Sequence, residues 1–203
     1  MCSLANRHKR LLLEVARRAM ILAVERRESL EDLPWEEGLI QPGGAFVTLH
    51  RRGRLRGCVG QITSTVPLVQ VIVSSAKAAA LEDSRFDPVR PEEVAEISIE
   101  LSILSPSHDV SPGEIEPGKH GLIVSYGWQR GVLLPQVATE HRWTAMRFLE
   151  ETCVKAGLEP NAWKDPKTHI QAFTAEVFGE SSLREEGAPQ AMQKNNAGYS
   201  SST

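Results

Sequence analysis

The sequence predicts an α+β fold with a largely antiparallel, barrel-like sheet and helices packed outside it. The order strand, strand, helix, strand occurs twice, over about residues 44–104 and 119–178. Short turns join the first two strands of each repeat, which favours antiparallel pairing. The chain has 203 residues, of which 41% are hydrophobic and 24% charged, as in an ordinary globular protein.

An N-terminal helix is predicted ahead of the repeats, over about residues 7–27. Leucine, valine and alanine recur there at helical spacing, with arginines between them. We expect this helix and the two repeats to form one domain over residues 7–180. The tail, residues 181–203, lacks apolar periodicity and is predicted to be disordered.

The first repeat begins with strands over residues 45–50 and 55–62, joined by the turn sequence "RRGR". A helix over residues 64–83 follows, with Thr65 as its expected cap. The run "EISIELSIL", residues 96–104, alternates isoleucine and leucine with glutamate and serine. Such alternation is typical of a strand with one buried and one polar face.

The second repeat is predicted to contain strands over residues 120–126 and 130–137 around "GWQ". A helix over residues 141–157 and a strand over residues 169–178 complete it. Glu176 then occupies the position in this repeat that Glu100 occupies in the first. Trp128 and the other tryptophans are expected to pack in or beside the core.

The stretch "LRGCVG", residues 55–60, is the strongest candidate for a functional site. Strand alternation puts Arg56 and Cys58 on one face, where the guanidinium would favour a thiolate. Gly57 and Gly60 are typical of a bulge or of a close approach by another group. The alternative is that Cys58 packs as a small hydrophobic residue, as free cysteines usually do.

A reactive cysteine would need assisting groups, and the sequence offers four. His120 is the candidate base, although a loop histidine can simply bond its own backbone. Glu100 and Ser102 project from the polar face of one strand, so they would either line a cleft or face water. Gln136 could supply an amide, although the preceding proline equally indicates the end of a strand.

Composition excludes several classes of function. A net charge of −3 gives no general attraction to nucleic acid, and no segment approaches the roughly 20 apolar residues that span a membrane. The three cysteines form no C-x-x-C pair, which argues against a disulfide framework or a cysteine zinc site and favours the cytoplasm. We therefore predict no metal, and the cofactor is left unassigned because no nucleotide-binding motif occurs.

Six segments together resemble one known family. They are "FVTLHRRGRLRGCVGQI", "EDSRFDPV", "ISIELSIL", "KHGLIV", "RGVLLPQVATEHRW" and "CVKAGL", and in this order they resemble the AMMECR-one domain family from about residue 8 to 180. LRGC-[IV]-G is the signature of that family. Arg85 and Phe86 also match, although Ser84 stands where the family usually has proline.

The resemblance implies an α+β domain with a barrel-like sheet made of two repeats, and no agreed reaction. The prokaryotic members are similar to component A of the AmmeMemoRadiSam set, which implies a Memo-like protein and a radical-SAM protein as partners. Arg56, Gly57, Cys58, Gly60 and Arg85 are the site positions that the match implies. Two hypotheses follow: a partner-binding or accessory module, or an enzyme in which Cys58 is the nucleophile, Arg56 favours its thiolate and Glu100 or His120 assists.

Overall fold

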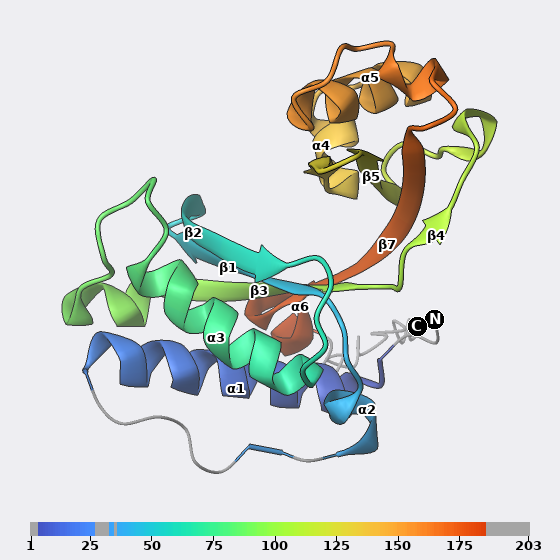
Figure 1. Cartoon of the computed structure of the whole chain (residues 1–203). Coiled ribbons are helices and arrows are strands. Elements are labelled where there is room, and N and C mark those ends of the chain that lie inside the picture. Colours follow the sequence, from blue (N-terminus) through green and yellow to red (C-terminus); the bar gives the residue numbers. More distant parts are fainter. Residues whose placement is uncertain (1–3, 27–32, 35, 186–203) are drawn as a thin grey trace, which may run out of the picture.

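A computed structural model describes residues 4–26, 33–34 and 36–185. Its sheet has the strand order β2-β1-β3-β7-β5-β6, all neighbours are antiparallel, and β4 pairs with β7 (Figure 1). The helices are α1 (Asn6–Val24), α2 (Glu37–Ile40), α3 (Leu68–Leu81), α4 (Pro135–Glu140), α5 (Ala145–Lys155) and α6 (Glu180–Glu185). The strands are β1 (Ala45–Arg51), β2 (Arg54–Gln61), β3 (Ile97–Leu104), β4 (His108–Asp109), β5 (His120–Tyr126), β6 (Gln129–Leu133) and β7 (His169–Gly179). The α+β prediction is confirmed.

The sheet is arranged as two halves that meet where β3 pairs with β7. The first half, β2-β1-β3, is built from the first strand-strand-helix-strand repeat, and the second half, β7-β5-β6, from the second. Helices α1 and α3 pack on one face of the first half, and α5 packs on β5 and β6. The long strand β7 curves from one half into the other (Figure 1).

The main core lies between α1, α3 and the first half of the sheet. Val47, Leu49, Ile99 and Leu101 fill it from the sheet, all at most 1% exposed. A smaller apolar cluster lies on the opposite face, where Phe173 is its largest fully buried member. This opposite face of the first half, which carries Phe46, Thr48, Cys58, Gly60, Glu100 and Ser102, is called the concave face below.

Two predicted helix starts and one predicted strand end are wrong for local reasons. Helix α3 begins after Pro67, which is its N-cap in place of the predicted Thr65. No side chain caps this helix, and the amide of its first residue, Leu68, donates to the Gln41 carbonyl. The strand predicted through residue 137 ends at Leu133. Pro135 has no backbone N–H to donate to a neighbouring strand, and its fixed φ suits the first turn of α4, which it begins. The hydroxyl of Thr144 accepts from the Arg147 amide, so α5 starts later than predicted.

The end of the N-terminal helix and the start of the tail also differ from their predicted positions. Helix α1 ends at Val24, and residue 27 of the predicted helix lies outside the described residues. Residues 181–185, predicted as the start of a disordered tail, belong to α6, and residues 186–203 lie outside the described residues. The α6 segment is anchored because Glu180 bonds the guanidinium of Arg17 and the Ile99 amide.

Trp128 does not pack in or beside the core, because its side chain is 93% exposed at the turn between β5 and β6. Trp143 and Trp163 do pack against the apolar cluster under α5, as predicted. Trp35 lies outside the described residues.

Candidate functional site

The "LRGCVG" segment lies in β2, an edge strand of the sheet, and contains a β-bulge. Leu49 pairs with Gly57 and the next residue, His50, pairs with Leu55, which leaves Arg56 as the extra residue. A bulge of this kind turns the side chain of the extra residue away from simple alternation. The predicted common face for Arg56 and Cys58 therefore does not form.

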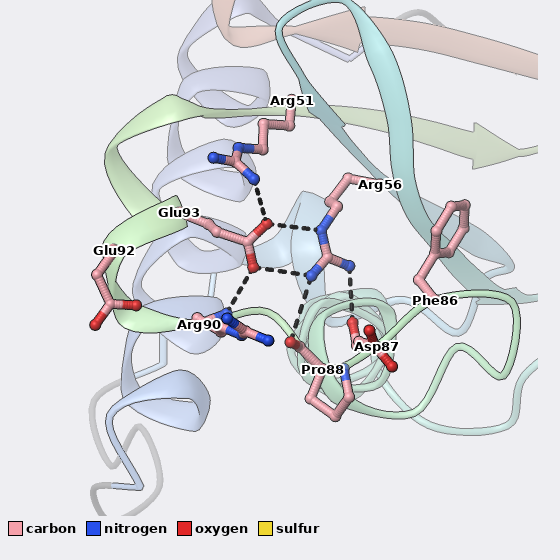
Figure 2. Close-up of a pocket in the computed structure, with 8 residues that line it drawn as sticks. All are labelled: Arg51, Arg56, Phe86, Asp87, Pro88, Arg90, Glu92 and Glu93. Atoms are coloured by element: carbon pink, nitrogen blue, oxygen red, sulfur yellow. Dashed lines mark hydrogen bonds and ion pairs between the residues drawn. The ribbon is translucent and has the colours of Figure 1, made fainter.

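Arg56 is directed to the loop before the 3-10 helix η1 (Pro91–Glu96), as Figure 2 shows. Its Nε and Nη2 donate to the two carboxylate oxygens of Glu93 at 3.0 and 2.9 Å. Nη1 and Nη2 also donate to the carbonyls of Asp87 and Pro88 at 2.9 and 3.3 Å. Because three guanidinium nitrogens are bonded in this way, Arg56 fastens β2 to the loop, and Cys58 is not among its hydrogen-bond partners in the described part of the chain.

Glu93 is the centre of this network. It also accepts from Arg51 Nη1 at 2.8 Å and from the Arg90 amide at 2.9 Å. The side chain is only 12% exposed, and the hydrogen bond from Arg56 lowers the pKa of Glu93 to about 2. The surrounding hollow of about 650 Å³ has arginine and carboxylate side chains in its lining, so it has no excess of either charge (Figure 2).

Gly57 and Gly60 allow close packing within the fold. A Cβ built on Gly57 would lie 2.1 Å from the carbonyl oxygen of Ala79 in α3. A Cβ on Gly60 would lie 2.3 Å from the Ala45 carbonyl oxygen. The close-approach interpretation is thus correct, but the approaching groups are backbone atoms of the same chain.

The second half of the sheet repeats this device. Arg130 and Gly131 in β6 correspond to Arg56 and Gly57 in β2, since each pair lies in an edge strand beneath its covering helix. A Cβ on Gly131 would lie 2.3 Å from the Ala156 amide nitrogen, just after α5. Both repeats therefore contain an Arg-Gly pair in which the glycine allows the covering helix to pack closely on the strand.

Cys58 is half-buried on the concave face and is held on three sides. Its Sγ accepts a hydrogen bond from Thr48 Oγ1 at 3.4 Å. Its amide donates to Asp83 Oδ2 at 2.8 Å, and its carbonyl accepts from Arg85 Nη2 at 3.1 Å. The last two bonds occupy the N–H and C=O groups of Cys58 on the open edge of the sheet. If unpaired, such groups on an edge strand can pair with a strand of another chain.

Arg85 is the cation near the thiol. Its Nη2 lies 2.7 Å from Asp83 Oδ2, and this hydrogen bond is the main cause that raises the pKa of Arg85 and lowers that of Asp83. The adjacent Cys58 side chain contributes to the rise for Arg85. The Arg85 side chain is 54% exposed, so water screens its effect on the sulfur.

Glu100 and Ser102 share the concave face with Cys58. Thr48 pairs with Cys58 on one side and with Glu100 on the other, so Glu100 lies two strands away from the cysteine. At a strand spacing of ~4.8 Å, this separation is roughly 10 Å. Ser102 pairs with Phe46 in the next row and is buried.

The structure does not bring His120 or Gln136 to Cys58. His120 pairs with Thr174 of β7, whereas Glu100 pairs with Gly179 of the same strand, five positions further on. Five residues of strand span roughly 16 Å, so His120 is remote from the cysteine. The His120 Nδ1 accepts a hydrogen bond from the Glu116 amide. This is the alternative in which the histidine bonds nearby backbone. Gln136 lies in the first turn of α4, in the second half of the molecule.

Three residues around "LRGCVG" were not singled out by the sequence reasoning. Thr48 could have been found, because alternation along "AFVTLH" puts it between Phe46 and His50 on one face. Asp83 lies in the matched segment "EDSRFDPV" but gave no separate signal. Glu93 lies 37 positions from Arg56, and no local pattern links the two.

Two absences hold for the described part of the chain. No three histidine, cysteine, aspartate or glutamate residues gather there closely enough to hold a metal ion. No helix in the described ranges is long and apolar enough to cross a membrane.

Comparisons with known proteins agree with the fold and identify the family. The model of the AMMECR1 family matches residues 13–178. A protein from Methanothermobacter thermautotrophicus is 42% identical over 181 residues, covering 84% of this chain and 93% of its own. A protein from Thermococcus gammatolerans is 44% identical over 164 residues, covering 75% and 79%.

A solved structure shares the fold. The crystal structure of an uncharacterized protein from Pyrococcus horikoshii is similar with a TM-score of 0.77 and 38% identity, covering 85% of this chain and 91% of that one. The family model covers most of the chain, and several relatives are about 40% identical over most of its length. The chain belongs to the AMMECR1 family.

Proposed function

We propose that this protein is an accessory, partner-binding module and that its concave face binds the partner. The observation that carries the proposal is that α1 and α3 pack only on the opposite face of β2-β1-β3 (Figure 1). The concave face therefore presents Thr48, Cys58 and Glu100 side by side without a helix over them in the described part of the chain.

The composition of this face supports protein binding. Val177, which pairs with Ser102 at one side of the concave face, is 49% exposed. Half-buried Phe46, Thr48 and Cys58 alternate with small side chains, and Glu100 supplies a single negative charge. A mixed polar and apolar surface with few charges at its centre is typical of non-obligate protein interfaces. The family resemblance indicates a Memo-like protein and a radical-SAM protein as partners.

Substitution of Val177 tests the surface. We expect Val177→Arg to weaken binding of the Memo-like protein from the same organism at least tenfold, because a charge would be buried against the partner. Val154→Arg is the matched control, since Val154 is 48% exposed on α5, away from the concave face. Binding is measured by fluorescence anisotropy with purified proteins. Equal weakening by both variants, or no binding of the wild-type chain, would contradict the proposal.

A cysteine-dependent enzyme is the second candidate. The hydrogen bond from Thr48 and the proximity of Arg85 favour it, because both stabilise negative charge on the sulfur. Against it stand the bonds of Arg56 to Glu93 and the distance to His120. The first candidate therefore has the stronger support.

Alkylation of Cys58 distinguishes the two candidates. In a Cys2→Ser background, Cys153 is fully buried and burial raises the pKa of its thiol, so iodoacetamide reports on Cys58. We expect Cys58 to react at pH 7 no faster than a cysteine in an unstructured peptide. A rate at least tenfold higher, which Arg85→Met abolishes, would favour the enzyme.

A further inference from the structure

A second hollow, of about 590 Å³, lies at the end of the sheet where β1 begins and β2 and β3 end. Leu68, Ile103 and Leu104 form its floor and are buried. Leu4 and Ile62 extend the apolar lining. A volume of this size is in the range of pockets that bind small molecules.

Backbone hydrogen bonds hold the walls of this hollow. The Leu68 amide donates to the Gln41 carbonyl at 3.0 Å, and the Leu104 amide donates to the Gly44 carbonyl at 2.9 Å. The Ser105 amide donates to the Thr174 carbonyl in β7 at 2.9 Å. Because the walls belong to the sheet and to the start of α3, a ligand would find the site already formed and would pay little ordering entropy.

The lining is polar only at its rim and is uncharged. None of the described residues that line the hollow carries a charge, although 24% of the chain is charged. Thr63, Ser107 and Gln41 supply rim side chains that have no hydrogen-bond partner among the described residues. A ligand that uses these groups must itself be neutral, since a charged group would lose hydration without a counter-charge.

Gly43 leaves room in the hollow. The nearest atom to a Cβ built on Gly43 is Leu68 Cδ1 at 3.7 Å, an ordinary contact distance. A longer side chain at this position would therefore extend over the apolar floor without disturbing the backbone. Glycine at residue 43 keeps the space open.

We propose that this hollow binds a small, neutral, mainly apolar molecule with one hydroxyl or carbonyl group. The apolar part packs on the accessible side chains of Leu4, Pro42 and Ile62, above the buried floor, and the polar group bonds the side chains of the rim. The hollow includes Ile62 and Leu104 from the end of the concave face, but Thr48, Cys58 and Glu100 are not among its lining residues. It goes beyond the proposed partner binding and does not depend on it.

The test is an NMR titration of the full-length chain with hexan-1-ol and with hexanoate, which share a chain length and differ in charge. We expect hexan-1-ol to give saturable shifts of the amides of Gly43, Gly44 and Ser105. Hexanoate is expected to bind at least tenfold more weakly. Absence of saturable shifts at these amides, or equal affinity for the two compounds, would overturn the proposal.

Two variants locate the site. We expect Gly43→Met to abolish the hexan-1-ol shifts, because its side chain occupies the hollow. Gly113→Met is the control, since nothing lies within 4 Å of a Cβ at Gly113, and it should bind as the wild type does. Retained binding in a folded Gly43→Met variant would place the ligand elsewhere. If that variant does not fold, the two-compound comparison on the wild-type chain still decides.

Discussion

Replacement of Gly57 by alanine is expected to lower the free energy of unfolding by about 3 kcal/mol or more. The added Cβ would lie 2.1 Å from the Ala79 carbonyl oxygen, so either α3 or β2 must move. Both elements belong to the main core, and neither can shift without loosening its packing. The midpoint of urea unfolding, followed by circular dichroism, measures the effect.

Gly113→Ala is the control for this substitution, because open space surrounds that position. We expect it to change stability by less than about 0.5 kcal/mol. Gly131→Ala should destabilise the second half in the same way as Gly57→Ala does the first, since its Cβ would also meet backbone. A Gly57→Ala variant with the wild-type midpoint would refute the close-packing explanation of this glycine.

Replacement of Arg56 by methionine is expected to cost about 3–5 kcal/mol of stability, as removal of one partner from a buried ion pair does. The side chains of Arg56 and Glu93 are 14% and 12% exposed, so the remaining carboxylate would be largely out of water. The same substitution should leave the alkylation rate of Cys58 within twofold of wild type, because Arg56 is bonded to Glu93, Asp87 and Pro88.

The double variant Arg56→Met/Glu93→Gln separates charge pairing from packing. We expect its loss of stability to be smaller than the sum of the two single losses, with a coupling of about 2 kcal/mol. Additive losses would mean that the two residues act independently. An Arg56→Met variant of normal stability in which Cys58 reacts tenfold more slowly would restore the sequence-based role of Arg56 as activator of the thiol.

Regular patterns predicted most of the fold. The alternation in "EISIELSIL" identified β3, whose isoleucines and Leu101 enter the core, although Ser102 of the predicted polar face is buried as well. The repeated order of strands and helices predicted the two halves of the sheet. Helix starts were less predictable, since Pro67, Pro135 and Thr144 lie close to other plausible boundary residues.

For "LRGCVG", sequence patterns predicted the strand but not the partners of its side chains. The bulge at Arg56 breaks the alternation on which its face was assigned, and its partner Glu93 is distant in sequence. The formal match of Glu100 and Glu176 also fails in space. Glu176 reaches the Leu4 amide and Lys9 on the α1 side of the sheet, whereas Glu100 lies on the concave face. The repeat is instead visible in Gly57 and Gly131.

Protection of Cys58 by a bound partner tests the central claim most directly, namely that the concave face is the binding surface. In the Cys2→Ser background, the alkylation rate of Cys58 is measured by mass spectrometry with and without a saturating amount of the Memo-like protein. If the partner covers Thr48, Cys58 and Glu100, the rate should fall at least tenfold in the complex. A stable complex in which Cys58 reacts at its free rate would contradict the claim.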